Sequence, residues 1–175
     1  MTFNLKQFVN PAAPRDLMSR VRAGDVSAFQ ELVQPFHRPV IAFFYRLLND
    51  AARAEDLAAD TFIKMYRGRH SYRNNELATW IYSSALDVLR QSKGLENFSL
   101  QAEITNAVAK LVRRLNEQER IALLLHKYQG LDISQIAEVL NTREDSAKAL
   151  LQTAYQQLTR QLQNCPAAGQ GRDTR

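Results

Sequence analysis

Residues 130–158 read GLDISQIAEVLNTREDSAKALLQTAYQQL and predict two short helices that meet at a tight corner. Asp132 is a suitable N-cap, and Gln135 three residues later completes a capping-box pattern ahead of an apolar stripe. Residues 141–142 interrupt the stripe, and apolar residues then recur at helical spacing as far as Leu158. The pattern is that of a helix-turn-helix, whose second helix can enter the major groove of DNA. An ordinary helical hairpin without DNA contact is the alternative.

The rest of the chain is also predicted to be helical. Of the 175 residues 45% are hydrophobic, with only 6 Gly and 5 Pro, and no segment alternates in the manner of a strand. We therefore expect an all-α protein of two small helical domains joined by a short linker, the second containing the helix-turn-helix. The expected boundaries are a loose lead-in (1–14), a first domain (15–91), a linker (92–100), a second domain (101–163) and a disordered tail (164–175).

Local signals divide the two domains into helices. Gly24 and Asp25 end one helix and start the next, and Pro35 and Pro39 predict a bend or a helix boundary. Helices are expected over 40–48, 54–66, 77–89, 100–115 and 116–128, with a short connection over residues 50–54 between the first two. The last helix is capped by Asn116 with Glu119 and ended by Gly130.

Composition narrows the compartment and the kind of partner. The single cysteine, Cys165, allows no intramolecular disulfide, which favours a reducing compartment. The first residues lack the apolar segment of a signal peptide, and no run approaches ~18 apolar residues, so we expect a cytoplasmic protein without membrane insertion. The formal charge of +5 favours polyanionic partners but is too small to identify one.

Residues 64–75, KMYRGRHSYRNN, combine four basic side chains with three rings and contain no acidic residue. Such a segment suits single-stranded or distorted nucleic acid, because cations meet phosphates and rings meet unstacked bases. A solvated loop whose tyrosines cover the core explains the composition equally well. Trp80, the only tryptophan, is either a core residue or a stacking surface beside this segment.

Enzymatic interpretations have little support. His37, His70 and His126 are scattered and lack partners at metal-ligand spacing, so no metal site and no cofactor are predicted. No glycine-rich phosphate loop is present. Asp56 and Asp60 are better explained as helix N-terminal charges and partner contacts than as a catalytic pair, so we expect no enzyme.

From about Asp16 to Leu162 the chain resembles the extracytoplasmic-function (ECF) sigma factors, the small promoter-recognition subunits of bacterial RNA polymerase. No single motif is decisive, but their order and spacing together are specific. The motifs that carry the resemblance are GDVSAFQELV (24–33), AEDLAADTFIKMY (54–66), TWIY (79–82), LNEQERIALLL (115–125) and GLDISQIAEVL (130–140).

The resemblance implies a division of work between the two domains. The first would bind core RNA polymerase and open and read the minus-ten promoter element, and the second would bind the minus-thirty-five element. An anti-sigma protein is an expected third partner, and the two domains are expected to pack on each other when no partner is bound. The implied contacts are Glu55, Asp56, Asp60, Phe62 and Ile63 for polymerase; Lys64, Arg67, Arg69, Tyr72, Arg73, Asn74 and Trp80 for the minus-ten element; and Arg143, Ser146, Lys148, Gln152 and Tyr155 for the minus-thirty-five element.

The chain departs from the family at several of these places. Ala59 stands where the family commonly has Gln, and Leu86 and Asp87 stand where it commonly has Arg-Asn. Lys148 is the only charged residue between Ser146 and Leu158, where the family usually has several arginines, so weak duplex binding is expected. The linker also looks shorter than is usual in the family.

These departures leave a second function open, that of a sigma-like adaptor or decoy that binds polymerase or an anti-sigma protein with little DNA binding of its own. A third, an ordinary helix-turn-helix repressor, would require tight duplex binding without polymerase, and the weakly charged second helix argues against it.

Overall fold

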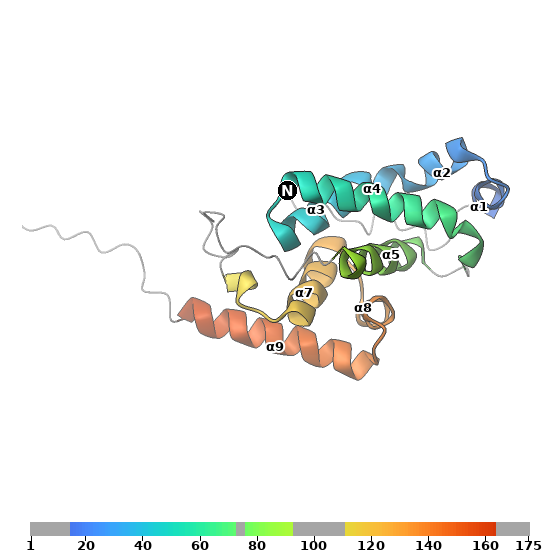
Figure 1. The fold of residues 1–175 in the computed structure, drawn as a ribbon. Helices are drawn as coiled ribbons and strands as arrows, with labels where there is room; N and C mark the ends of the chain where they lie inside the picture. Colours follow the sequence, from blue (N-terminus) through green and yellow to red (C-terminus); the bar gives the residue numbers. More distant parts are fainter. Residues whose placement is uncertain (1–14, 73–75, 93–110, 164–175) are drawn as a thin grey trace, which may run out of the picture.

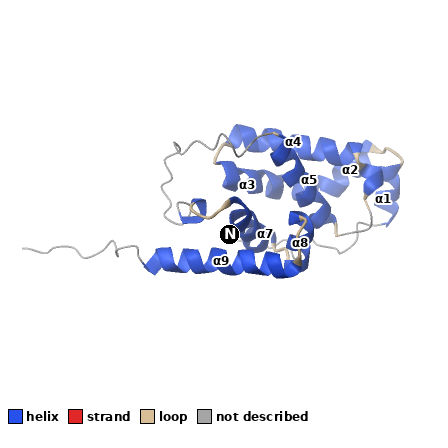
Figure 2. Cartoon of the chain, turned by 60° about the horizontal axis from the view of Figure 1, so that its bottom comes forward, coloured by secondary structure: helices blue, strands red, loops and turns tan. Residues whose placement is uncertain are grey.

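The structure, a computed structural model, describes residues 15–72, 76–92 and 111–163 (Figure 1). All regular elements within these residues are helices, which confirms the predicted all-α class (Figure 2). In chain order they are α1 (Arg15–Arg22), α2 (Val26–Val33), η2 (Gln34–Phe36), α3 (His37–Leu48), α4 (Ala51–Arg67), η3 (Arg69–Ser71), α5 (Leu77–Gln91), α7 (Glu117–Gln129), α8 (Ile133–Leu140) and α9 (Glu144–Gln163).

The break between α1 and α2 lies where the sequence predicts it. Gly24 has φ +94°, a conformation that L side chains rarely adopt, and Asp25 follows as the N-cap of α2. The Asp25 carboxylate accepts a hydrogen bond from the backbone N–H of Ala28 at 3.0 Å and pairs with Arg20 at 2.7 Å. These bonds, the first-named above all, lower the pKa of Asp25.

The next two boundaries show one correct prediction and one error. Pro35 lies at the start of the 3₁₀ turn η2, and Pro39 lies in the first turn of α3, where its missing N–H costs no hydrogen bond. The connection predicted over 50–54 is wrong, because α4 already begins at Ala51. Asp50 is its N-cap and accepts a hydrogen bond from the N–H of Arg53 at 3.1 Å.

In the second half the capping signals are confirmed. Asn116 and Glu119 form a capping box at the start of α7, and Gly130 ends that helix with φ 70°. Asp132 and Gln135 form the same reciprocal pair at the start of α8. Most of the helix predicted over 100–115 lies outside the described residues. The described part of this range is helical over 111–113.

The corner between α8 and α9 closes through backbone geometry. Asn141 adopts the left-handed conformation with φ 53°, and the N–H of Thr142 donates to the Ala137 carbonyl at 2.8 Å. The Ala137 side chain is buried at this corner. Helix α9 begins at Glu144, two residues after the interruption that the sequence marks at 141–142.

The two halves of the chain, α1–α5 and α7–α9, share one hydrophobic core. Helix α5 lies between the layer of α3 and α4 and the layer of α7 and α8 (Figure 1), and it packs against both α4 and α8. Helices α3 and α7 also touch, while α9 packs on α7 and α8. Side chains with no or almost no exposed surface come from both halves and include Phe43, Ile81, Tyr82, Leu125 and Ile136.

Candidate nucleic-acid interface

The basic segment begins at the end of α4, where Arg69 is held in place by its neighbours. Its guanidinium lies 4.9 Å from the centre of the Tyr66 ring, and its Nη1 donates to the Tyr66 carbonyl at 3.1 Å. The Tyr66 hydroxyl in turn donates to the Gly24 carbonyl at 2.8 Å. The turn between α1 and α2 therefore fixes this part of the basic segment.

The burial of Tyr72 and Trp80 shows whether each ring covers the core or is accessible for stacking on a base. Tyr72 is only 4% exposed, and burial raises the pKa of its hydroxyl. Its ring lies 4.9 Å from the ring of the half-buried Trp80, and its carbonyl accepts from Arg22 at 2.9 Å. In this conformation Tyr72 covers the core and does not offer a stacking face, whereas Trp80 is partly accessible.

The cations of the segment differ in how free they are. Lys64 Nζ pairs with the Asp87 carboxylate at 3.0 Å, so the acid that departs from the family pattern neutralises a predicted DNA contact. Arg67 is exposed. Arg73 and Asn74 lie outside the described residues. Leu86, the other departure in this pair of positions, is 1% exposed and belongs to the core.

The exposed side of α4 carries the residues predicted to contact polymerase. Glu55, Asp56 and Asp60 are exposed, and Ile63 is 48% exposed although it is a large apolar side chain. Phe62 is partly buried, with its ring stacked on His37 at 5.8 Å. A shallow groove between α4 and α5 adjoins this surface and is lined by Asp60, Ile63, Lys64, Arg67, Val88, Gln91 and Ser92.

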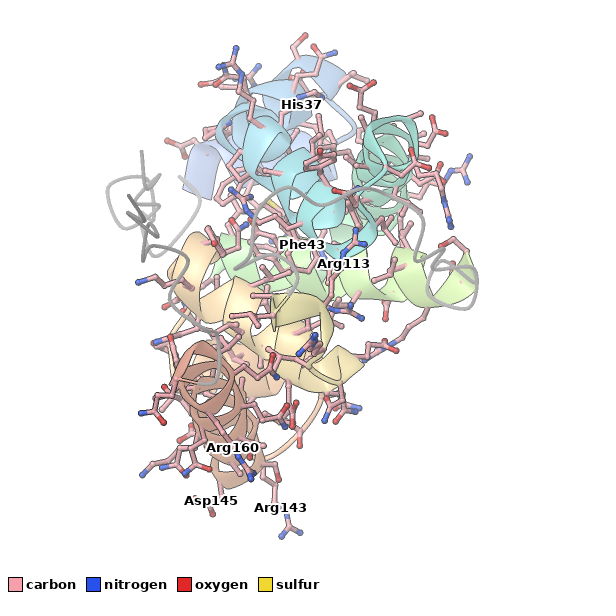
Figure 3. All side chains as sticks on the ribbon, turned by 90° about the vertical axis from the view of Figure 1, so that its left-hand side faces the viewer. His37, Phe43, Arg113, Arg143, Asp145 and Arg160 are labelled. Carbon is pink, nitrogen blue, oxygen red and sulfur yellow. The ribbon has the colours of Figure 1, made fainter. Side chains whose placement is uncertain are left out.

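The helix-turn-helix presents a second surface at the opposite end of the molecule from His37. Arg143 and Asp145 project from this end (Figure 3). The predicted minus-thirty-five contacts are all exposed, with Tyr155 at 42% exposure; they are Arg143, Ser146, Lys148, Gln152 and Tyr155. The structure thus places the predicted minus-ten and minus-thirty-five contacts on different halves.

Contacts between the halves are the site features that the sequence did not predict. The buried Tyr82 hydroxyl donates to Gln129 Oε1 at 2.6 Å, and the Arg46 guanidinium lies 4.3 Å from the centre of the Tyr128 ring. No local pattern marks these residues, because each pair joins helices that are distant in sequence. A buried tyrosine needs a partner for its hydroxyl, but the sequence does not say which one.

A group of carboxylates lies where the halves meet. The Glu76 pKa is raised, first by burial and then by the nearby Asp132 and Glu138 carboxylates. Glu76 Oε2 is buried and has no hydrogen-bond partner in the described part of the chain. Ionised Glu76 therefore weakens this contact between α5 and α8.

The histidines have structural surroundings or face solvent. His126 Nδ1 lies 3.0 Å from the Leu131 carbonyl, His37 stacks on Phe62, and His70 is exposed. Within the described residues no three metal-ligating side chains come close enough to hold an ion. None of the described helices has the length and apolar character needed to cross a membrane.

Two family models match the chain, and both matched ranges extend into the undescribed segment 93–110. Sigma-70 region 2 matches residues 32–93, and Sigma-70, region 4 matches residues 105–158. Together the two ranges span about two thirds of the chain.

Curated relatives are similar over most of their length. The RNA polymerase sigma-H factor of Pseudomonas aeruginosa is 25% identical, with 85% of this chain and 93% of the relative aligned. The ECF RNA polymerase sigma factor BldN of Streptomyces coelicolor is 27% identical over 87% of this chain and 69% of its own. SigW of Bacillus subtilis, another ECF sigma factor, is 24% identical, with 84% of this chain and 95% of the relative aligned.

Solved structures share the fold. CnrH in complex with the cytosolic domain of CnrY superposes with a TM-score of 0.71 at 16% identity, covering 87% of this chain and 98% of the other. The sigma factor RpoE of Bartonella quintana, solved with the anti-sigma factor NepR, gives a TM-score of 0.67 at 19% identity, covering 81% and 100%. At these identities the likeness concerns the fold alone.

Proposed function

Because the chain belongs to the extracytoplasmic-function sigma factors, we propose that its two halves bind the two elements of a bacterial promoter while the chain is bound to core RNA polymerase. The protein is a transcription initiation factor. Its contribution is binding energy, since directing polymerase to a promoter and holding its unpaired bases makes and breaks no covalent bond. The work takes place in the cytoplasm, where polymerase and promoter meet.

The first half is assigned to polymerase and to the minus-ten element. Support for the polymerase contact comes from the exposed acidic and apolar side of α4, where Ile63 lies beside Asp56 and Asp60. The minus-ten contact is assigned to the adjoining end of α4 and the turn after it. There the exposed Arg67 and the anchored Arg69 would meet phosphates, and the accessible part of Trp80 would meet a base.

The second half is assigned to the minus-thirty-five element through α9. Capping boxes and the left-handed Asn141 hold α8 and α9 at their corner. The side of α9 that faces away from the core is exposed along its first three turns. A helix presented in this way fits the major groove.

One observation carries the proposal: the regions 2 and 4 of a sigma factor fall on the two halves in that order, and each matched range contains an exposed candidate DNA surface. Run-off transcription tests it. Core polymerase from the bacterium that encodes the chain should give a promoter-specific product at low salt only when the full chain is added. Binding to core without any specific product would overturn the promoter assignment.

The alternative function, an adaptor or decoy for polymerase or for an anti-sigma protein, has two observations in its favour. Asp87 neutralises Lys64, and Lys148 is the only cation in the first three turns of α9. Persistent core binding without promoter-specific transcription would support it. An anti-sigma protein is proposed as a partner in either case, because the similar RpoE and CnrH folds were solved as complexes with NepR and with the cytosolic domain of CnrY.

A further inference from the structure

The outer face of α9 consists mainly of small and uncharged polar side chains and carries one acid and one cation. Core packing uses Ala147, Leu151 and Ala154, which are buried against α7 and α8. At 3.6 residues per turn, the residues between these point away from the core. We define the outer face by six exposed residues: Asp145, Lys148, Ala149, Gln152, Thr153 and Gln156.

The outer face has no arginine. Lys148 is its only cation, and the next one along α9, Arg160, lies twelve residues further on. At a rise of 1.5 Å per residue that separation is ~18 Å, which exceeds the ~12 Å width of the major groove. An arginine fork on guanine, the commonest specific base contact, is therefore not available from the middle of this helix.

The Gln152 amide is free to bind. Its neighbour on the other side of the helix, Gln157, donates its amide to the Glu119 carboxylate at 3.3 Å and so helps to seat α9 on α7. Within the described residues, neither Gln152 nor Gln156 makes such a bond. Gln152 thus has a donor and an acceptor to offer a base edge without breaking an internal contact.

We propose that α9 reads an A·T-rich segment of the minus-thirty-five element, with Gln152 bound to an adenine. A glutamine amide can accept from the adenine N6 amino group and donate to N7, which no other base matches in the major groove. Ala149 lies one turn before both Gln152 and Thr153 on the outer face, and Ala149 and Thr153 each carry a methyl group that suits the 5-methyl of thymine. The inference rests on the proposed promoter function and adds the base class that the helix selects.

Selection from random DNA tests this inference. Holoenzyme made from the full chain and core polymerase is given double-stranded DNA of random sequence upstream of a run-off cassette, and the transcribed molecules are amplified and sequenced. The upstream element should be A·T-rich and contain one fixed adenine. Changing that A·T pair to G·C should lower the run-off yield of the wild-type protein about 5- to 100-fold.

The variant Gln152→Ala should lose this discrimination at the same base pair and keep it at the others. Gln163→Ala is the matched control, because Gln163 is an exposed glutamine of α9 about 16 Å further along the axis. It should discriminate as the wild type does.

Three outcomes would overturn the inference. They are an upstream element that requires guanine at the Gln152-dependent position, discrimination that Gln152→Ala leaves intact, and enrichment confined to the minus-ten segment. The first two would leave the proposed function standing, whereas the third would also remove the assignment of the second half to the minus-thirty-five element. A pool with no enriched element of either kind would overturn the proposed function as well.

Discussion

The Tyr82 hydroxyl and the Gln129 side-chain carbonyl lie 2.6 Å apart in the shared core, although the two residues belong to different halves of the chain. Tyr82 has no exposed surface and Gln129 is 3% exposed. Tyr82 also packs edge-on against Phe43, with ring centres 5.4 Å apart. This hydrogen bond therefore ties α5 to the end of α7 inside the protein, where water cannot replace either partner.

Removing only the Tyr82 hydroxyl should destabilise the fold. Tyr82→Phe leaves Gln129 Oε1 buried without its donor, which costs about 1–3 kcal/mol in the free energy of unfolding. The double variant Tyr82→Phe with Gln129→Leu should recover most of the loss, because both polar groups are then gone. Urea unfolding followed by circular dichroism measures both effects. A single variant as stable as the wild type would show that the bond is not important for packing.

Breaking the Lys64–Asp87 ion pair should strengthen DNA binding. Asp87→Asn removes a negative charge and frees Lys64 for a phosphate. The promoter affinity of the holoenzyme should therefore rise, and the slope of log K against log salt concentration should become steeper by about one. The measurement is a salt titration of promoter binding. In a Lys64→Met background, Asp87→Asn should not change the salt dependence of promoter binding. If Asp87→Asn steepens the salt dependence equally with and without Lys64, Lys64 is excluded as the phosphate contact.

The basic segment should matter more for promoter opening than Lys148 does. Arg69→Ala combined with Arg73→Ala removes two cations from the segment proposed to bind the minus-ten element, while Lys148→Ala removes one cation from the helix proposed to bind the minus-thirty-five element. Open-complex formation, measured by permanganate reactivity of unpaired thymines, should fall further in the first variant. The thermal midpoints must be compared, because Arg69 also packs on Tyr66. The reverse ranking would place the main DNA contact on α9.

Glu76 should make the contact between the halves sensitive to pH. Burial raises its pKa in the folded protein above the ordinary value of a glutamate, so the folded state holds this proton more tightly than the unfolded state. Its contribution to stability is present below the unfolded pKa and is lost as the pH rises through the folded pKa.

Glu76→Gln should remove this loss. Relative to wild type, the variant should gain stability in urea at pH 7 but not at pH 4. Glu138→Gln provides a comparison on the other side of the contact, at an exposed position. A difference between Glu76→Gln and wild type that is the same at both pH values would rule out titration of Glu76 as the cause.

Much of the fold followed from local signals in the sequence. The capping boxes at Asn116 and Asp132, the restart at Asp25 and the end of α7 at Gly130 depend on neighbouring residues only, and all of them are confirmed. The early start of α4 was missed because Asp50 was assigned to a connection, although its cap bond to Arg53 is just as local.

The packing of the halves could not be predicted in the same way. Tyr82 and Gln129 are 47 positions apart. The pattern of apolar residues in either helix does not indicate which residue of the other helix is the partner. The candidate DNA contacts illustrate a similar limit. Composition alone left Tyr72 with two interpretations, and only its burial against Trp80 distinguishes them in this conformation. The roles of the exposed residues on α4 and α9 stay predictions.

Helix α5 is covered from both sides, since ten of its fifteen residues are buried and it packs on both α4 and α8. A fragment that ends after residue 92 would retain α5 but lose the helices that cover its far side. Tyr82 would then face water in the isolated fragment. We expect residues 15–163 to unfold in one cooperative transition, with the first half alone forming an incomplete folding unit. We therefore expect the boundary between the two matched regions not to separate two independently folding domains.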